Sequence, residues 1–210
     1  MNQPDDDVST STFVERRPTG ALIPVIPAGR WAVDPSRSKV RFIAKHLLVS
    51  KVTGVFTRVA GTIVVGEDAS LSSVSAMADA GSLTTGDAAR DEHLRSADFF
   101  DVDQWPTMTI TGSGLRSKGG RHVLEAILTI RDISHPVTLV VTATNLARDG
   151  DGHPLATGGV VPRPTARFTA EAVVNRKDFG LVWNAAIETG GVVVGDMVRI
   201  DIVAIAELQP

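Results

Sequence analysis

The stretch MVRIDIVAIAEL, residues 197–208, alternates two kinds of side chain. Apolar residues occupy every second position, among them Ile200, Ile202 and Ala204, while Arg199 and Asp201 fall between them. Successive side chains of a β-strand point to opposite faces of a sheet, so this period of two predicts a strand with one buried and one solvated face.

Seven further segments show the same period, and turn residues separate them. The segments are SKVRFIAKHL (38–47), AGTIVVG (60–66), VSAMADA (74–80), TMTITG (107–112), HVLEAILTI (122–130), PVTLVVTAT (136–144) and ARFTAEAVV (166–174). GSGLRSKGGR (112–121) is typical of a turn between strands, and ARDGDGHP (147–154) of a mobile loop. Antiparallel strands joined in this way favour a barrel or a sandwich. We therefore predict an all-β, eight-stranded antiparallel barrel.

One segment, residues 86–100, is predicted to be helical. Thr85 or Asp87 is a suitable N-cap, and Asp91 and Arg95 are four residues apart on one helix face. The segment is part of RDEHLRSADFFDVDQWP (90–106), where charge and aromatic bulk are concentrated. We expect its charged residues to organise the helix through local ion pairs and caps, and its aromatic residues to plug or rim one mouth of the barrel. The predicted mouth residues are Arg90, His93, Leu94, Phe99, Phe100 and Trp105.

The less charged face of each strand is unusually rich in alanine and glycine. Such small side chains leave space in a closed barrel, and several together approach the volume of a ligand pocket, about 300 to 1,000 Å³. The alternative is that the alanines simply fit a narrow or flattened barrel, or reflect a composition bias across the whole chain. The pocket interpretation predicts one long apolar tunnel for an elongated apolar guest, lined by Phe42, His46, Ala76, Met108, Ile110, Ala126, Leu128, Leu139, Val141, Ala143, Phe168 and Ala170.

Composition argues against several functional classes. A net charge of −3 without any basic tract disfavours nucleic-acid binding. The chain has no cysteine, and its five histidines are not spaced as metal ligands, so we predict neither a metal site nor a cofactor. We see no export signal and no transmembrane segment, and expect a cytoplasmic location. Residues 1–29 are predicted to be a flexible extension, and 30–210 the barrel domain.

Six motifs resemble the YceI-like family in the order in which they occur: WAVDPSRSKVRFIAKH (31–46), GVFTRVAGTI (54–63), SLTTGDAARDEHLRSADFFDVDQWPTMT (82–109), LTIRDISHPVTL (128–139), VNRKDFGLVWN (174–184) and GDMVRIDI (195–202). The resemblance implies a lipocalin-like barrel whose apolar tunnel holds a polyisoprenoid lipid. The chain departs from the family pattern at Arg37-Ser38, where a His-Ser pair is usual, and at Val59, where an aromatic residue is common. Many relatives are periplasmic.

These observations together predict a protein that binds an elongated isoprenoid lipid, quinone-like or polyprenyl, for storage, transport or sensing. The alternatives are a protein-interaction or stress-response module without a lipid guest and, less favoured, an enzyme using Asp91, His93 and Ser96. Homodimerisation is left open. Residues 87–103 hold six acidic residues against two arginines, which predicts a neutral head group at this mouth, whereas an anionic head would suit the opposite mouth, expected near Arg176 and Lys177.

Overall fold

The computed structural model describes residues 26–46, 50–145, 163–184 and 194–210. The predicted mobile loop 147–154 and residues 1–25 of the predicted extension lie outside these ranges. The strands are β1 (Gly29–Val33), β2 (Lys39–His46), β3 (Ser50–Phe56), β4 (Val59–Val65), β5 (Ser73–Asp79), β6 (Leu83–Thr84), β7 (Thr107–Lys118), β8 (Arg121–Ile130), β9 (Ile133–Asn145), β10 (Thr165–Asn175) and β11 (Val194–Leu208). The helices are η1 (Ala69–Leu71), η2 (Ala80–Ser82), α1 (Ala88–Arg95) and η3 (Arg176–Phe179).

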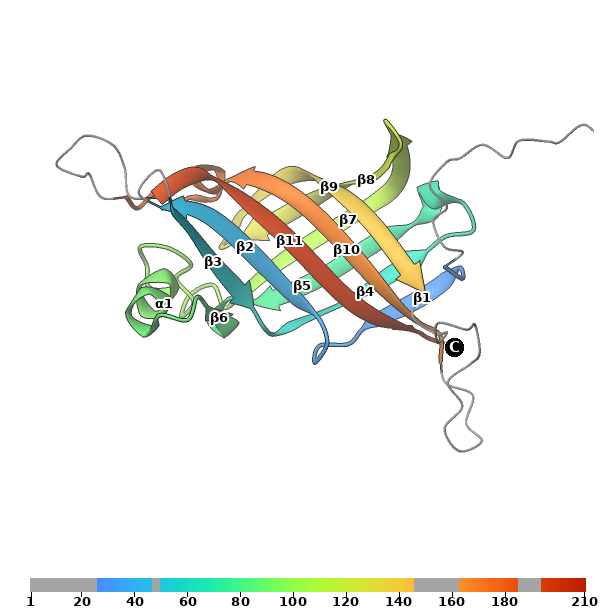
Figure 1. The fold of residues 1–210 in the computed structure, drawn as a ribbon, viewed down its shortest axis with the longest axis horizontal. Helices are drawn as coiled ribbons and strands as arrows, with labels where there is room; N and C mark the ends of the chain where they lie inside the picture. Colours follow the sequence, from blue (N-terminus) through green and yellow to red (C-terminus); the bar gives the residue numbers. More distant parts are fainter. Residues whose placement is uncertain (1–25, 47–49, 146–162, 185–193) are drawn as a thin grey trace, which may run out of the picture.

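Eight of these strands close into a barrel (Figure 1). Neighbours pair antiparallel in the order β1-β4-β5-β7-β8-β9-β10-β11, and β1 closes the ring by pairing with the last residues of β11. The first half of β11 pairs instead with β2, which is followed by β3 and β6 along the same edge. The predicted eight-stranded antiparallel barrel is therefore confirmed.

Strands β1, β3 and β6 were not predicted: β1 and β6 are short, and in β3 Gly54 interrupts the apolar side of SKVTGVF. The structure supplies the reason for this glycine. A Cβ atom at Gly54 would lie 2.2 Å from the ring of Phe42 on the neighbouring strand β2. The ring of Phe42 thus occupies the space that a side chain at position 54 would need, and β3 keeps its pairing with β2 without a regular hydrophobic pattern.

Helix α1 is shorter than predicted. Asp87 is its N-cap, with the side chain accepting a hydrogen bond from the backbone N–H of Arg90. The helix ends at Arg95, because Ser96 has extended backbone angles and its hydroxyl donates to the carbonyl of His93. Beyond it the chain turns, and Asp101 adopts a left-handed conformation with φ of 48°. The predicted end at Phe100 was therefore wrong.

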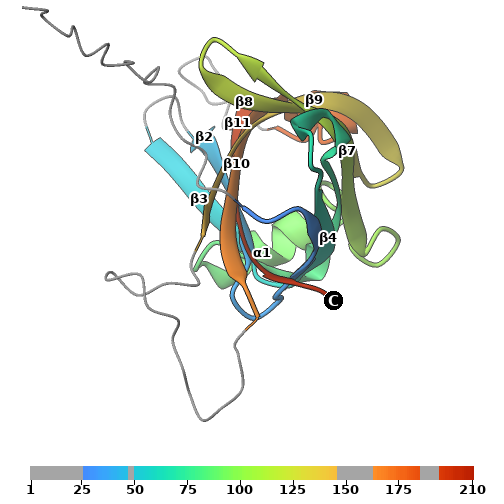
Figure 2. The ribbon, with the colours of Figure 1, turned by 90° about the vertical axis from the view of Figure 1, so that its right-hand side faces the viewer.

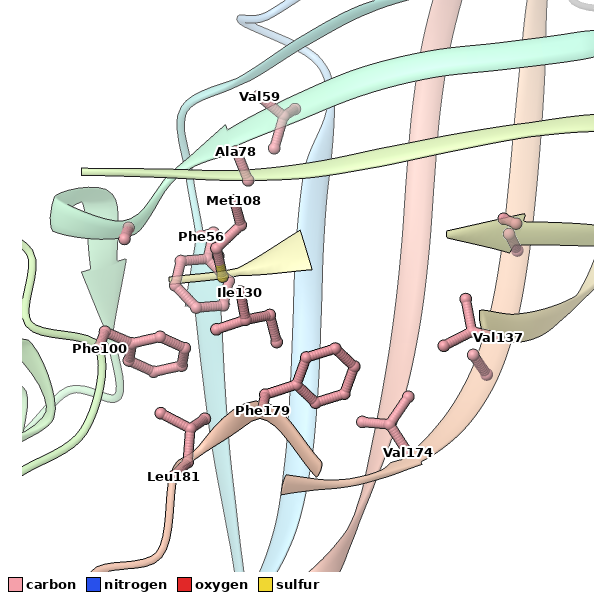
Figure 3. Packing of buried hydrophobic residues seen from close by; sticks show 14 of the residues in the cluster. Phe56, Val59, Ala78, Phe100, Met108, Ile130, Val137, Val174, Phe179 and Leu181 are labelled. Atoms are coloured by element: carbon pink, nitrogen blue, oxygen red, sulfur yellow. The ribbon is translucent and has the colours of Figure 1, made fainter. Parts of the chain in front are cut away.

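The two ends of the barrel differ in how they are filled. At the α1 end, which also contains η3 and the β8–β9 turn, Phe56, Phe100, Met108, Phe179 and Leu181 form a buried cluster (Figure 3). At the other end, which we call the hairpin end after the β7–β8 turn, Trp31 is fully buried, with its ring edge-on to Phe168 at 5.7 Å. In the described part of the chain no helix is long and apolar enough to cross a membrane.

Candidate functional site: an apolar cavity in the barrel

The barrel encloses a cavity of about 760 Å³ that extends between its two ends. Leu94, Phe100 and Phe179 line it at the α1 end, and Gly120 and His122 at the hairpin end. The volume falls within the range of about 300 to 1,000 Å³ that is usual for ligand pockets. The interior is therefore not a filled core, as the alanine-rich strand faces predicted.

Most of the predicted tunnel residues line this cavity. Strand alternation placed them correctly because one face of every barrel strand must point inward. The ten that line it are Phe42, Ala76, Met108, Ile110, Leu128, Leu139, Val141, Ala143, Phe168 and Ala170. Their contact with a guest stays a prediction.

Ala126 is buried but does not line the cavity, contrary to the prediction. It is directly opposite Gly112 on β7, and a Cβ atom at Gly112 would lie 2.8 Å from the Cβ of Ala126. The methyl group of Ala126 thus fills the space that Gly112 leaves. Its replacement by leucine would overpack the wall instead of entering guest space. The side chain of His46, the twelfth predicted residue, lies outside what the structure describes.

Leu94, Phe99 and Phe100 line the α1 end of the cavity, as predicted for a plugged mouth. The ring of Phe100 stands edge-on to Phe56 at a centroid distance of 5.4 Å. His93 lies outside this layer, with its ring 5.2 Å from that of Phe99 and its Nε2 atom 3.0 Å from the Asp98 carboxylate. These contacts bind the segment after α1 to the end of the barrel.

Two other predicted mouth residues do not line the cavity. Arg90 donates through Nε to the hydroxyl of Thr85, 2.8 Å away, and Trp105 is half-buried beyond the lining layer. The indole that packs on the plug is that of Trp183, whose ring centroid is 4.5 Å from that of His93. The sequence analysis did not predict this role for Trp183. The alternation of Phe179, Leu181 and Trp183 along VNRKDFGLVWN could have indicated it, because alternate residues of an extended segment share one side.

Asp91 anchors α1 and does not form the ion pair predicted with Arg95. Its carboxylate is buried and accepts hydrogen bonds from the Thr84 hydroxyl at 2.9 Å and from the Thr85 N–H and hydroxyl at 2.7 and 2.6 Å. Burial works to raise the pKa of Asp91, but the hydrogen bonds from Thr85 and Thr84 outweigh it and hold the pKa below its usual value. Arg95 donates instead to the carbonyls of Gly81 and Leu83. Helix α1 is thus fastened to the chain before it from two sides.

Arg176 lies at the same end of the barrel as α1, so the expectation of an opposite mouth there was wrong. Its buried guanidinium donates to the carbonyls of Trp183 at 2.9 Å and Gly195 at 3.1 Å, and pairs with Asp196 at 3.2 Å. Asp196 also binds Lys177, whose hydrogen bond is the largest cause of its lowered pKa. Arg176 and Lys177 therefore hold the chain around η3 together, and both already have partners within the protein.

Within the described part of the chain, the cavity lining is more exposed at the hairpin end than at the α1 end. The lining side chains at the hairpin end are half-buried or exposed, including Leu115, Arg121 and His122, whereas Phe100 and Phe179 at the α1 end are buried. Figure 2 looks along the barrel from the hairpin end, with α1 behind the ring of strands. Among the described residues, no carboxylate lines the cavity.

The polar residues of α1 do not form a catalytic arrangement. Asp91 faces Thr84 and Thr85, His93 faces Asp98, and the Ser96 hydroxyl donates to a main-chain carbonyl. The Ser96 hydroxyl is therefore engaged by a main-chain carbonyl and not by the His93 imidazole that would have to activate it. In the part of the chain that the structure describes, no three potential metal ligands of the His, Cys, Asp or Glu type lie close enough together to hold an ion.

The family model of the YceI-like domain matches residues 31–206. The chain belongs to the YceI-like family. A UPF0312 protein of Staphylococcus aureus (strain MSSA476) is 32% identical over 171 residues, which cover 80% of this chain and 91% of the relative. The predicted family is therefore confirmed over nearly all of the barrel.

Solved structures show the same fold at lower identity. BcnA of Burkholderia cenocepacia has a TM-score of 0.65 and 23% identity, over 82% of this chain and 98% of its own. A polyisoprenoid binding domain from Saccharophagus degradans, implicated in plant cell wall breakdown, has a TM-score of 0.58 and 18% identity, over 85% and 98%. Structural similarity at this level of sequence identity establishes the barrel architecture.

Proposed function

We propose that this protein binds an elongated amphiphilic isoprenoid lipid, quinone-like or polyprenyl, inside the barrel, and that it acts as a carrier, store or sensor of that lipid rather than as an enzyme. The observation that carries the proposal is the cavity itself: about 760 Å³, extending between the two ends of the barrel and lined almost wholly by apolar side chains. Family membership and the polyisoprenoid-binding neighbour support the same class of guest.

The two ends of the cavity define how such a guest would lie. The α1 end is closed by buried apolar side chains such as Phe100 and Phe179, which suit a hydrocarbon tail. The hairpin end offers polar lining groups, among them Ser72, His122 and Thr142, within reach of solvent. We therefore expect the head group at the hairpin end. The acidic segment around α1 would then lie at the other end of the guest and would not select the charge of the head group.

The test is to extract the purified protein with an apolar solvent and identify co-purified lipid by mass spectrometry. Ala143→Leu should reduce the lipid content about tenfold or more, because the added atoms enter the cavity. Thr144→Leu is the control: it places the same leucine side chain one residue later, where it is exposed on the outer wall. We expect the control to retain its lipid.

A persistently empty wild-type barrel, one that also fails to take up added prenyl quinone or prenyl diphosphate, would contradict the proposal. Equal loss of lipid in the two variants would contradict the assignment of the cavity as the binding site, provided that their melting temperatures match.

A further inference from the structure

The β7–β8 hairpin, residues 113–122, carries three cations at the open end of the cavity. Gly119 and Gly120 form its turn with φ of 58° and 73°. A two-residue turn with both φ values positive matches the twist of the flanking strands and fixes their register. In that register Lys118 is directly opposite Arg121, and Arg116 is opposite Val123.

The hairpin has two chemically different faces. Arg116 and Lys118 are two residues apart on one strand and share a face with Arg121, the partner of Lys118. Leu115 and His122 lie on the other face and line the cavity, and Arg121 also contributes to its lining. All three cations are exposed, and the hairpin tip projects beyond the neighbouring strands (Figure 1). We call Arg116, Lys118 and Arg121 the basic face.

The basic face has no internal counterion among the described residues. None of its three cations takes part in an ion pair there, although Arg90, Arg131 and Arg176 at the α1 end all do. Glu67 and Asp68, on the neighbouring connection between β4 and η1, are not paired with it either. Like charges directly opposite each other destabilise a pair of strands. An external anionic surface would therefore relieve the repulsion between Lys118 and Arg121, for which the described residues supply no counterion.

We propose that the basic face docks on a lipid bilayer containing anionic lipids and thereby sets the open end of the cavity against the bilayer. The role in lipid exchange rests on the proposed function, since an isoprenoid guest is poorly soluble in water and would pass from bilayer to cavity without crossing solvent. The docking itself rests on the hairpin alone. The cations lie beside the opening at Gly120 and His122, so contact and exchange occur at one place.

The experiment measures sedimentation of the full chain with vesicles of phosphatidylcholine, with or without one quarter phosphatidylglycerol. We expect binding to the anionic vesicles only, and its loss at 0.5 M salt, where exposed charges are screened. Arg116→Gln/Lys118→Gln should weaken the binding about 30-fold, from the loss of two cations that face the bilayer.

The chain offers a control of equal charge in Lys45 and Lys51, two cations that are also exposed, on β2 and β3. Neither lines the cavity. Lys45→Gln/Lys51→Gln removes the same charge and should change binding less than threefold. Equal weakening by the two double variants would overturn the proposal, because the attraction would then follow net charge. Equal binding to neutral vesicles would also overturn it.

A second measurement separates this proposal from the proposed function. Arg116→Gln/Lys118→Gln should retain its bound lipid after purification, because neither residue lines the cavity, yet transfer the lipid to anionic vesicles at least tenfold more slowly than the wild type. A protein that docks but carries no lipid would sink the proposed function and leave the docking intact. If the wild type and the double variant both carry lipid and transfer it equally fast, the role of the hairpin is contradicted and the cavity assignment is unaffected.

Discussion

The α1 end and the hairpin end of the barrel differ in charge and in the burial of the side chains that line the cavity. The α1 end is closed by buried aromatic side chains and covered by residues 87–103, where six carboxylates outnumber two arginines. The hairpin end leaves lining side chains accessible, and its residues 112–124 carry three cations and no carboxylate. A barrel with one sealed end and one open end would admit the proposed guest in a single orientation, which a tunnel open at both ends would not impose.

The difference also shows where stability and function separate. Side chains at the sealed end contact one another and have little contact with solvent, so changes there cost folding free energy. At the hairpin end Trp31 is also fully buried, but the rim side chains Leu115 and His122 are only half-buried, so changes at this rim should alter exchange of the proposed guest more than the fold. The predictions below test this division from the largest expected effect to the smallest.

The largest effect is expected at Phe179, which is 1% exposed. Phe179→Ala should lower the free energy of unfolding by about 3 to 5 kcal/mol, because it opens a cavity within the plug. Leu115→Ala, at the half-buried rim of the open end, should cost about 1 kcal/mol or less. Urea denaturation of both variants gives the comparison. Equal costs would mean that the two ends are equally well packed.

Asp91 should have the next largest effect. Asp91→Ala is expected to cost about 2 kcal/mol, because it leaves the donors of Thr84 and Thr85 without their acceptor. Asp98→Ala is the control: it lies close by, but its carboxylate is exposed, and its removal should cost about 0.5 kcal/mol or less. Thermal unfolding measures both. A cost for Asp91→Ala no greater than that of the control would contradict the anchoring role.

The smallest expected effect is on the pH dependence of stability. The pKa of Asp91 is lowered in the folded protein, so the folded state binds fewer protons than the unfolded state near that pKa. Its stabilising contribution is complete above the unfolded pKa and is lost as pH falls through the folded pKa. Between pH 5 and 3 the stability of Asp91→Asn should therefore fall less steeply than that of the wild type. If the stability of Asp91→Asn fell with pH as steeply as that of the wild type, the Asp91 carboxylate would not be the group whose protonation is coupled to unfolding.

The barrel wall could be predicted from the sequence because every ring strand buries one face. Period two alone placed Met108, Leu139 and Ala170 on the cavity surface. The method failed where a neighbouring strand decides the packing. Ala126 has the right parity, but its methyl group fills the space above Gly112, and this pairing depends on a register that one strand does not reveal.

The ends of the barrel could be predicted less well than its wall. Asp91 and Arg95 have the spacing of a helical ion pair, yet each binds the chain that precedes the helix, and those contacts are tertiary. Trp183 and Trp105 are equally plausible plugs by composition, and only the fold brings Trp183 against His93. Which end was open could not be predicted either, because the segment richest in charge and aromatics covers the sealed end.

The orientation of the guest tests the difference between the two ends most directly. A prenyl quinone analogue with a photoreactive group on its head should be bound, irradiated and located by peptide mass spectrometry, and a second analogue should carry the group at the end of its tail. We expect the head probe to label the region of Leu115 and His122, and the tail probe the region of Phe100 and Phe179. The reverse pattern, or labelling of both regions by one probe, would contradict a barrel with one open and one sealed end.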